Sequence, residues 1–195
     1  QSLIRRAELN PEELPELADR MVREVQRVRD IIAVSQSRIE HSVGAAEPLS
    51  VGAMLRDVLP LLRQISDDHG VAVRIEGADL EVSILGNRVS LQQVLVNLVR
   101  NACEAMASKP VSERRLSIEA REEGAQVALT IQDNGPGFPP DIIRTGHALF
   151  ASTKRMGSGF GLPIATAILT THGGSLEISN DESGGARVTC RIPRG

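Results

Sequence analysis

The residues that most constrain how this chain can fold lie between positions 133 and 162, where residues with unusual backbone freedom are concentrated. Six of the 17 glycines and all three phenylalanines fall in this stretch. Glycine is favoured where the backbone adopts a positive φ or approaches another group closely. The glycines form two clusters, 135–137 and 157–161, and the second leads directly into a helical pattern at 162–171. A glycine-rich loop at a helix N-terminus is typical of a phosphate-binding site, because unpaired N–H groups and the helix dipole both favour negative charge.

Ordinary turns are the alternative explanation, and for a single glycine cluster they would be the better one. Here two clusters occur together, and Asp133 opens the first of them. A helical pattern with an unusual polar face also precedes them at residues 88–107. This combination favours phosphate binding.

The helix predicted at 88–107 combines a broad apolar face with a polar stripe. The stripe consists of Gln93, Asn97, Asn101 and Glu104. Asparagine is a middling-to-poor helix former, so Asn97 and Asn101, one turn apart, need an explanation. A solvated surface is one explanation, although Lys and Glu are more usual there. The other is a pair of amide oxygens directed at Mg²⁺, which takes oxygen ligands and shares them with phosphates.

Length and composition limit the classes of protein that this chain can represent. Its 195 residues suffice for one medium domain and an appendage. The net charge is −3 without a block of Lys or Arg, which argues against a nucleic-acid partner. No apolar run has the length of a membrane span and no signal-peptide pattern occurs, so we expect no membrane contact by these residues and a cytoplasmic location, with any membrane anchor elsewhere in a parent protein. Cys103 and Cys190 lack metal-ligand spacing, and we expect both in the core.

The first 45 residues are expected to be helical and separate from the rest. Residues 1–9 have the pattern of a helix end, and residues 14–39 carry apolar residues at heptad spacing, typical of a helix bundle. A single helix cannot bury such a face, so we expect a helical hairpin that forms a homodimer. The alternative is a helix that packs on its own domain. Residues 44–48 break the pattern and are predicted to be a linker.

The remaining residues alternate between helical and strand patterns. Helices are predicted at 50–68, 88–107 and 163–171, and strands at 71–75, 81–85, 116–121, 126–132, 175–179 and 186–192. Strands joined by short turns, with the helices segregated from them, predict an α+β fold. We expect a two-layer α/β sandwich with a mostly antiparallel sheet and helices on one face, preceded by the helical-hairpin segment.

Several segments resemble, in order, the sequence boxes of the GHKL ATP-binding superfamily. Residues 97–102 (NLVRNA) are similar to its N box, 133–138 (DNGPGF) to its G1 box and 157–162 (GSGFGL) to its G2 box. Residues 149–154 (LFASTK) resemble the F-box region and lid of bacterial sensor histidine kinases, and 184–193 fit their last box. The resemblance implies a catalytic ATP-binding domain at 46–195. It also implies that residues 1–45 are the later part of a dimerisation and histidine-phosphotransfer hairpin.

ATP and Mg²⁺ are the ligands that this resemblance implies. Asp133 would accept a hydrogen bond from the adenine amine and repel a guanine carbonyl, while Asn97 and Asn101 would hold the metal against the phosphates. Asn97 and Lys154 are the implied catalytic residues. Of these, Lys154 would neutralise charge on the transferring phosphoryl group. The implied nucleotide-binding residues are Asn97, Asn101, Asp133, Gly135, Gly137, Phe150, Thr153, Lys154, Gly157, Gly159, Phe160, Gly161 and Leu162.

The first position of the N box separates the branches of this superfamily. In the chaperone and gyrase branches of the superfamily that this chain resembles, this position carries a glutamate that activates water. Here it is Asn97, which cannot act as a base. The family's acceptor motif, His-Glu/Asp-x-x-x-Pro, is missing, because none of His41, His69, His147 and His172 precedes an acidic residue. We expect these histidines to be structural or solvated. The implied function is the kinase core of a two-component sensor, which phosphorylates a histidine outside this chain and, from there, a response-regulator aspartate.

Two alternatives to this function stay open at the level of the sequence. One is a non-catalytic module of the same fold that senses nucleotide or serves as a scaffold. The other is a GHKL ATPase.

Overall fold

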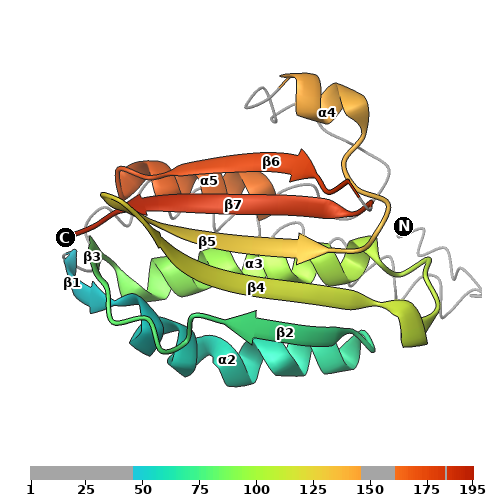
Figure 1. The fold of residues 1–195 in the computed structure, drawn as a ribbon, viewed down its shortest axis with the longest axis horizontal. Coiled ribbons are helices and arrows are strands. Elements are labelled where there is room, and N and C mark those ends of the chain that lie inside the picture. The colour runs from blue at the N-terminus through green and yellow to red at the C-terminus, as the bar shows by residue number, and fades with distance from the viewer. Residues whose placement is uncertain (1–45, 146–160, 183) are drawn as a thin grey trace, which may run out of the picture.

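The computed structural model describes residues 46–145, 161–182 and 184–195. These residues form two layers, a twisted sheet and a layer of helices (Figure 1). The predicted helical hairpin at 1–45 lies outside the described residues, so the heptad pairing and the homodimer stay predictions.

The main sheet has five strands in the order β2-β4-β5-β7-β6. Their bounds are β2 Ala72–Glu76, β4 Arg115–Glu123, β5 Gln126–Asp133, β7 Ala186–Pro193 and β6 Ser175–Asn180. β2 and β4 are parallel, and the other three pairings are antiparallel. The prediction of a mostly antiparallel sheet is therefore confirmed.

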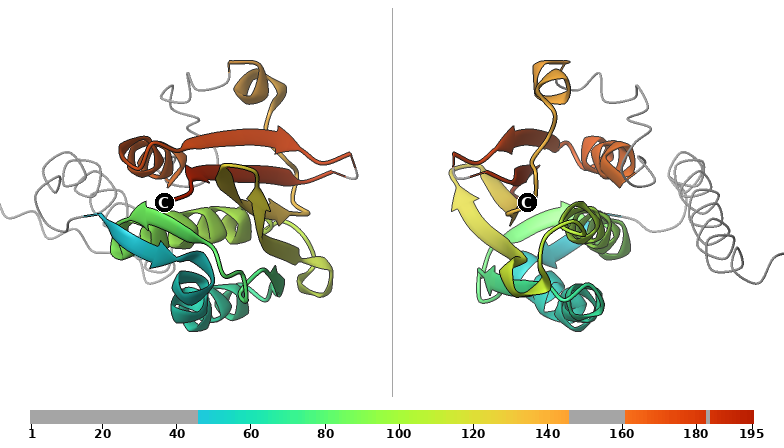
Figure 2. Two further views of the ribbon diagram at one scale, coloured as in Figure 1. Left: turned by 60° about the vertical axis from the view of Figure 1, so that its left-hand side comes forward. Right: turned by 90° about the vertical axis from the view of Figure 1, so that its right-hand side faces the viewer.

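Three long helices cover one face of this sheet, as Figure 2 shows most clearly. They are α2 (Val51–Asp68), α3 (Arg88–Ala105) and α5 (Gly161–Thr171). Their apolar faces and the inward residues of the strands form one buried core. This arrangement confirms the predicted sandwich with helices on one face. Among the described residues, no helix combines the length and hydropathy needed to cross a lipid bilayer.

The boundaries of these helices follow from local side-chain chemistry. Ser50 Oγ accepts a hydrogen bond from Ala53 N (3.3 Å), and Asn87 Oδ1 accepts one from Ser90 N (3.0 Å), which caps α2 and α3. Gly70, just after α2, adopts a left-handed conformation with φ +62°. Glycine reaches this region without a steric penalty, so it ends the helix at the predicted position.

The linker prediction for residues 44–48 is wrong at its end, because Glu47 and Pro48 belong to a strand. β1 (Glu47–Ser50) pairs antiparallel with β3 (Ser83–Gly86) in a separate two-stranded sheet. Pro48 suggested a break, but an edge strand tolerates proline because one side of it needs no N–H donor. Two short helices that we did not predict, η2 (Val111–Glu113) and α4 (Pro140–Thr145), complete the described elements.

Side chains alternate between the two faces of the main sheet, which separates the core from a polar surface. On β5, for example, Leu129, Ile131 and Asp133 face the helices, while Thr130 and Gln132 face the opposite side, which none of the three long helices covers. We call this second side the open face. Asp133 therefore ends a core-facing row of apolar side chains, and only its position at the strand end gives it access to a ligand.

Candidate functional site

Asp133 is the most constrained polar residue of the site. It is the last residue of β5, and only 6% of its surface is exposed. Its Oδ1 accepts hydrogen bonds from the backbone N–H groups of Gly135 (2.8 Å) and Ala186 (3.2 Å). Burial raises the pKa of the Asp133 carboxyl, although these two N–H groups and the nearby Lys109 ammonium act in the opposite direction.

The two donors leave the carboxylate with a defined orientation. Both N–H groups bond to Oδ1, and within the described part of the chain no donor bonds to Oδ2. Oδ2 is thus an oriented acceptor at the end of a strand. A charged acceptor held in this way binds an amine or amide donor more strongly than a freely rotating carboxylate does, because its side chain loses little conformational entropy on binding.

The glycines after Asp133 allow the chain to pass close to other groups. A Cβ on Gly135 would lie 2.9 Å from Asp133 Oδ1 and 3.4 Å from Met106 Cγ, at the C-terminal end of α3. Gly137 has φ +75°, and a Cβ there would lie 2.8 Å from Asn180 Oδ1. Both residues therefore shape the loop that carries Asp133.

Asn180 holds this loop in place, and the sequence analysis did not identify it. Its Oδ1 accepts from Phe138 N (2.7 Å), and its Nδ2 donates to Phe138 O (2.9 Å). Asn180 ends β6 just before a turn. An asparagine there suggests turn formation and nothing more, so no sequence signal pointed to this contact.

Asn97 and Asn101 lie on α3 as predicted, and each has a distinctive environment. Asn97 Oδ1 accepts from Gln93 Nε2 (2.7 Å), whereas Asn97 Nδ2 is buried without a partner among the described residues. Turning both amides over would keep the bond between Gln93 and Asn97 and place an oxygen at the unpaired position. Such an oxygen fits a ligand of Mg²⁺, so the residues present are compatible with the predicted metal.

Asn101 links the N box to the start of α5. A Cβ on Gly161 would lie 2.8 Å from both Cγ and Oδ1 of Asn101, and closer still to its Nδ2. Gly161 is the buried first residue of α5, and Leu162 is partly buried against the core. The fold thus brings the predicted amides of α3 beside the helix end that was predicted to face phosphate.

Six predicted site residues belong to the segment 146–160, which lies outside the described residues, so their roles stay predictions. These residues are Phe150, Thr153, Lys154, Gly157, Gly159 and Phe160.

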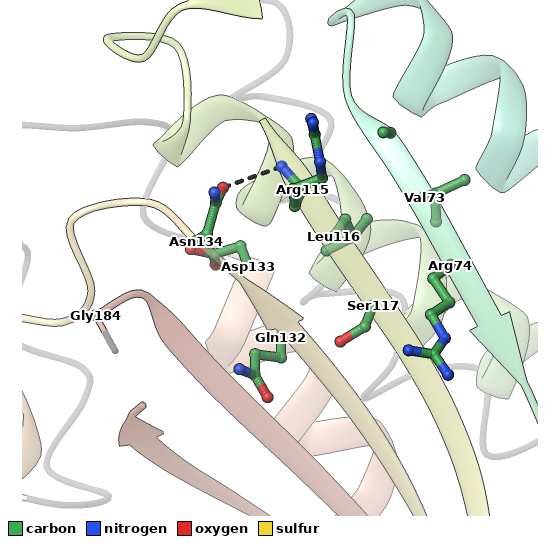
Figure 3. Close-up of a pocket in the computed structure, with 10 residues that line it drawn as sticks. Val73, Arg74, Arg115, Leu116, Ser117, Gln132, Asp133, Asn134 and Gly184 are labelled. Atoms are coloured by element: carbon green, nitrogen blue, oxygen red, sulfur yellow. Dashed lines mark hydrogen bonds between the residues drawn. The ribbon is translucent and has the colours of Figure 1, made fainter. Parts of the chain in front are cut away.

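A cavity of about 320 Å³ lies on the other side of the sheet (Figure 3). Arg74, Ser117 and Gln132 line it from the open face, and it reaches Asp133 and Asn134 at the end of β5. It does not include Asn97, Asn101 or Gly161. The cavity therefore shares Asp133 with the predicted nucleotide site but includes none of its residues on α3 and α5.

The described cysteines and histidines have structural environments, as predicted. Cys103 and Cys190 are buried free thiols, and burial raises their pKa values to about 11 and about 12. His172 Nε2 accepts from Asn87 N (3.0 Å), and its Nδ1 lies 2.8 Å from Ile168 O. His69 Nδ1 contacts Ile65 O at 2.8 Å. Among the described residues, no three His, Cys, Asp or Glu side chains form a metal-binding cluster.

Comparison with known proteins supports the relationship suggested by the sequence boxes. The family model described as "Histidine kinase-, DNA gyrase B-, and HSP90-like ATPase" matches residues 86–195. The sensor histidine kinase TmoS of Ectopseudomonas mendocina is 31% identical over 93% of this chain and 19% of its own length. The sensor protein FixL of Bradyrhizobium diazoefficiens is 34% identical over 87% of this chain and 32% of its own length. The chain thus spans less than a third of the length of these two relatives.

Solved structures show the same fold. The nucleotide-free catalytic domain of histidine kinase ThkA superposes with a TM-score of 0.66, covers 77% of this chain and 97% of its own, and is 24% identical. ThkA in complex with its response regulator TrrA superposes with a TM-score of 0.71 over 95% of this chain and 53% of its own, at 21% identity.

Proposed function

Because this chain belongs to the histidine kinase-, DNA gyrase B- and HSP90-like ATPase family, we propose that it is the kinase core of a two-component sensor. In this proposal it binds ATP and transfers the γ-phosphoryl group to a histidine outside this chain. A response-regulator aspartate then receives that group. The single observation that carries the proposal is the oriented, buried carboxylate of Asp133 at the end of a core strand.

Adenine recognition follows from the orientation of Asp133. Oδ1 is occupied by two backbone donors, so Oδ2 faces the ligand as an acceptor. The 6-amino group of adenine donates to such an oxygen, whereas the 6-carbonyl of guanine would be repelled by it. A charge-assisted hydrogen bond of this kind contributes about 1.5–3 kcal/mol, which supports the choice of ATP over GTP.

The phosphates would lie between α3 and the start of α5. Asn97 and Asn101 would hold Mg²⁺ with their amide oxygens, and the metal would supply charge neutralisation for the phosphates. The backbone N–H groups at the start of α5, beginning with Gly161, favour negative charge. Lys154 would supply the positive charge near the transferring phosphoryl group.

The identity of Asn97 favours transfer over hydrolysis. An amide cannot accept a proton from water, so the site has no general base at this position. The acceptor histidine is expected outside this chain, since His69 and His172 hold structural contacts and none of the four histidines lies in an acceptor motif.

The experiment that tests the proposal supplies the missing acceptor. The chain is incubated with ATP labelled on the γ-phosphate and with a separate helical hairpin that contains an acceptor histidine. We expect acid-labile label on the hairpin in the presence of Mg²⁺. Binding of ATP without transfer would instead favour the non-catalytic module, and release of labelled phosphate without labelled hairpin would favour an ATPase.

The proposed partners are ATP, a receiver domain and a second copy of this chain. The complex of ThkA with TrrA shows that a protein of this fold is found with a response regulator. The heptad pattern at 14–39 supports a homodimer. The cytoplasm is the proposed location, because ATP and a receiver domain must both reach the site.

A further inference from the structure

The N–H group of Ala186, which donates to Asp133, directly follows the turn between β6 and β7. Contacts on the open face of the sheet hold this turn in place. Ala186 is the first residue of β7, directly after the turn that joins it to β6. Its N–H lies 3.2 Å from Asp133 Oδ1. The position of this N–H therefore depends on the position of the turn.

Close backbone packing leaves the turn little freedom to move relative to Asp133. Gly185 has φ +99°, and a Cβ there would collide with Asp133 O and lie 2.9 Å from Asn134 Cα. Within the turn, Asp181 N donates to Gly185 O (3.0 Å) and Gly184 N donates to Asp181 O (3.0 Å). The turn thus rests directly on the peptide that follows Asp133.

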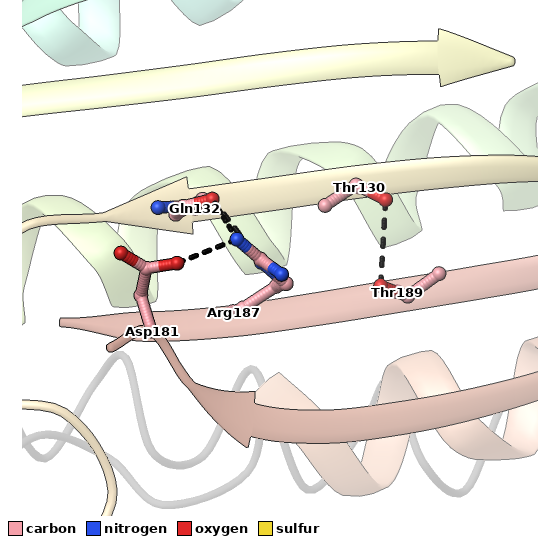
Figure 4. A network of polar contacts seen from close by, with 5 residues as sticks. All are labelled: Thr130, Gln132, Asp181, Arg187 and Thr189. Atoms are coloured by element: carbon pink, nitrogen blue, oxygen red, sulfur yellow. Dashed lines mark hydrogen bonds and ion pairs between the residues drawn. The ribbon is translucent and has the colours of Figure 1, made fainter. Parts of the chain in front are cut away.

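Arg187 connects this turn to the strand that carries Asp133. Its Nη2 donates to Asp181 Oδ1 (2.6 Å), and its Nε and Nη2 donate to Gln132 Oε1 at 3.1 and 2.9 Å. Gln132 directly precedes Asp133 and pairs with Arg187 across the two strands. Figure 4 shows the guanidinium between these partners on the open face of the sheet. A planar guanidinium is suited to fix two groups at once, because its donors are rigidly spaced.

We propose that Arg187 is a positioning residue for adenine recognition, which acts through the turn 181–185 on Asp133. It touches no ligand, since it lies on the face opposite the nucleotide. It holds the turn against β5, so that Ala186 N–H stays on Oδ1 and Oδ2 stays directed at the base. This inference rests on the proposed function and adds to it a determinant of base specificity on the far face of the sheet.

The test compares two arginines of the same strand. Arg187→Met removes the guanidinium and keeps the apolar stem. Arg191→Met is the matched control, because Arg191 lies on the same face and loses two ion pairs, to Glu123 and Glu177, far from Asp133. Affinities for ATP and inosine triphosphate are measured by competition on the full chain. Inosine triphosphate carries a carbonyl where ATP has the 6-amino group.

We expect Arg187→Met to weaken ATP binding about three- to tenfold, the effect of loosening one hydrogen bond, with little change for inosine triphosphate. The preference for ATP then falls, which a general loss of stability would not cause. Losing the Ala186 donor also raises the pKa of Asp133 further, so the loss of ATP affinity on acidification should begin at higher pH. Arg191→Met should change neither property.

Arg187→Lys keeps the charge and one contact, so it should retain most of the preference for ATP over inosine triphosphate. It replaces Arg187→Met in the test if the latter does not fold. The inference is overturned if Arg187→Met behaves like Arg191→Met, or if it weakens both nucleotides equally. Asp133→Asn separates this failure from that of the proposed function. If Asp133→Asn abolishes the preference for ATP, base recognition stands and only the role of Arg187 is lost; if it changes nothing, base recognition itself is wrong.

Discussion

At the scale of single residues, the site depends on a buried carboxylate that is costly to keep ionised. Asp133 has lost most of its contact with water, and two backbone N–H groups stabilise only one of its oxygens. Its pKa is raised above the usual value of an aspartate. A group with a raised pKa in the folded state favours folding at low pH, and this contribution is lost as the pH rises through that pKa. Asp133 therefore serves binding at the expense of stability.

Replacing Asp133 by Asn should separate these two effects. Asn keeps the shape and an oxygen that accepts from Gly135 and Ala186, but it presents an amide nitrogen to the adenine amine. We expect ATP affinity to fall at least tenfold by isothermal titration. The free energy of unfolding at pH 7, measured by urea titration, should stay equal or increase, and its dependence on pH in the acidic range should become weaker. Unchanged affinity, or a clear loss of stability at pH 7, would count against the assigned role.

At the scale of elements, the turn before β7 is where backbone geometry matters most. Gly185→Ala would place a Cβ against Asp133 O in a left-handed conformation. We expect a loss of about 2–3 kcal/mol in the free energy of unfolding, together with weaker ATP binding. The control is Gly124→Ala in the turn between β4 and β5. It also has a left-handed φ (+61°) but an open surrounding, so about 1 kcal/mol is expected without any effect on ATP. Equal losses in both variants would show that packing of the turn on β5 is unimportant.

The elements also show how far the sequence can be interpreted by itself. Alternating and helical patterns predicted the three long helices and the strands of the main sheet, because burial imposes the period of the element on the sequence. Asn97 and Asn101 were singled out because asparagine is unusual on a helix, and Asp133 because it opens the first glycine cluster and belongs to a segment that resembles the G1 box. Arg187 and Asn180 could not be identified in this way. Gln132 lies 55 residues from Arg187 and Phe138 lies 42 residues from Asn180 in the sequence, and only the tertiary fold brings each pair together.

At the scale of the whole molecule, residues 46–195 contain every element that the structure describes and one continuous core. We therefore expect this part to fold without the first 45 residues and to bind ATP with unchanged affinity. The full chain should form a dimer through residues 1–45, and the shortened chain should be a monomer. Light scattering checks the size of each, and titration with ATP checks the affinity. A monomeric full chain would contradict the interpretation of the heptads.

The most direct test of adenine recognition by this fold is a pair of titrations on the unaltered chain. ATP and GTP are each added to millimolar concentration in the presence of Mg²⁺, and the heat of binding is measured. If the Asp133 carboxylate contacts the base, the chain should bind ATP at least tenfold more tightly than GTP, since the loss of one charge-assisted hydrogen bond costs more than about 1.4 kcal/mol. Equal affinities, or no binding of ATP at all, would contradict the account.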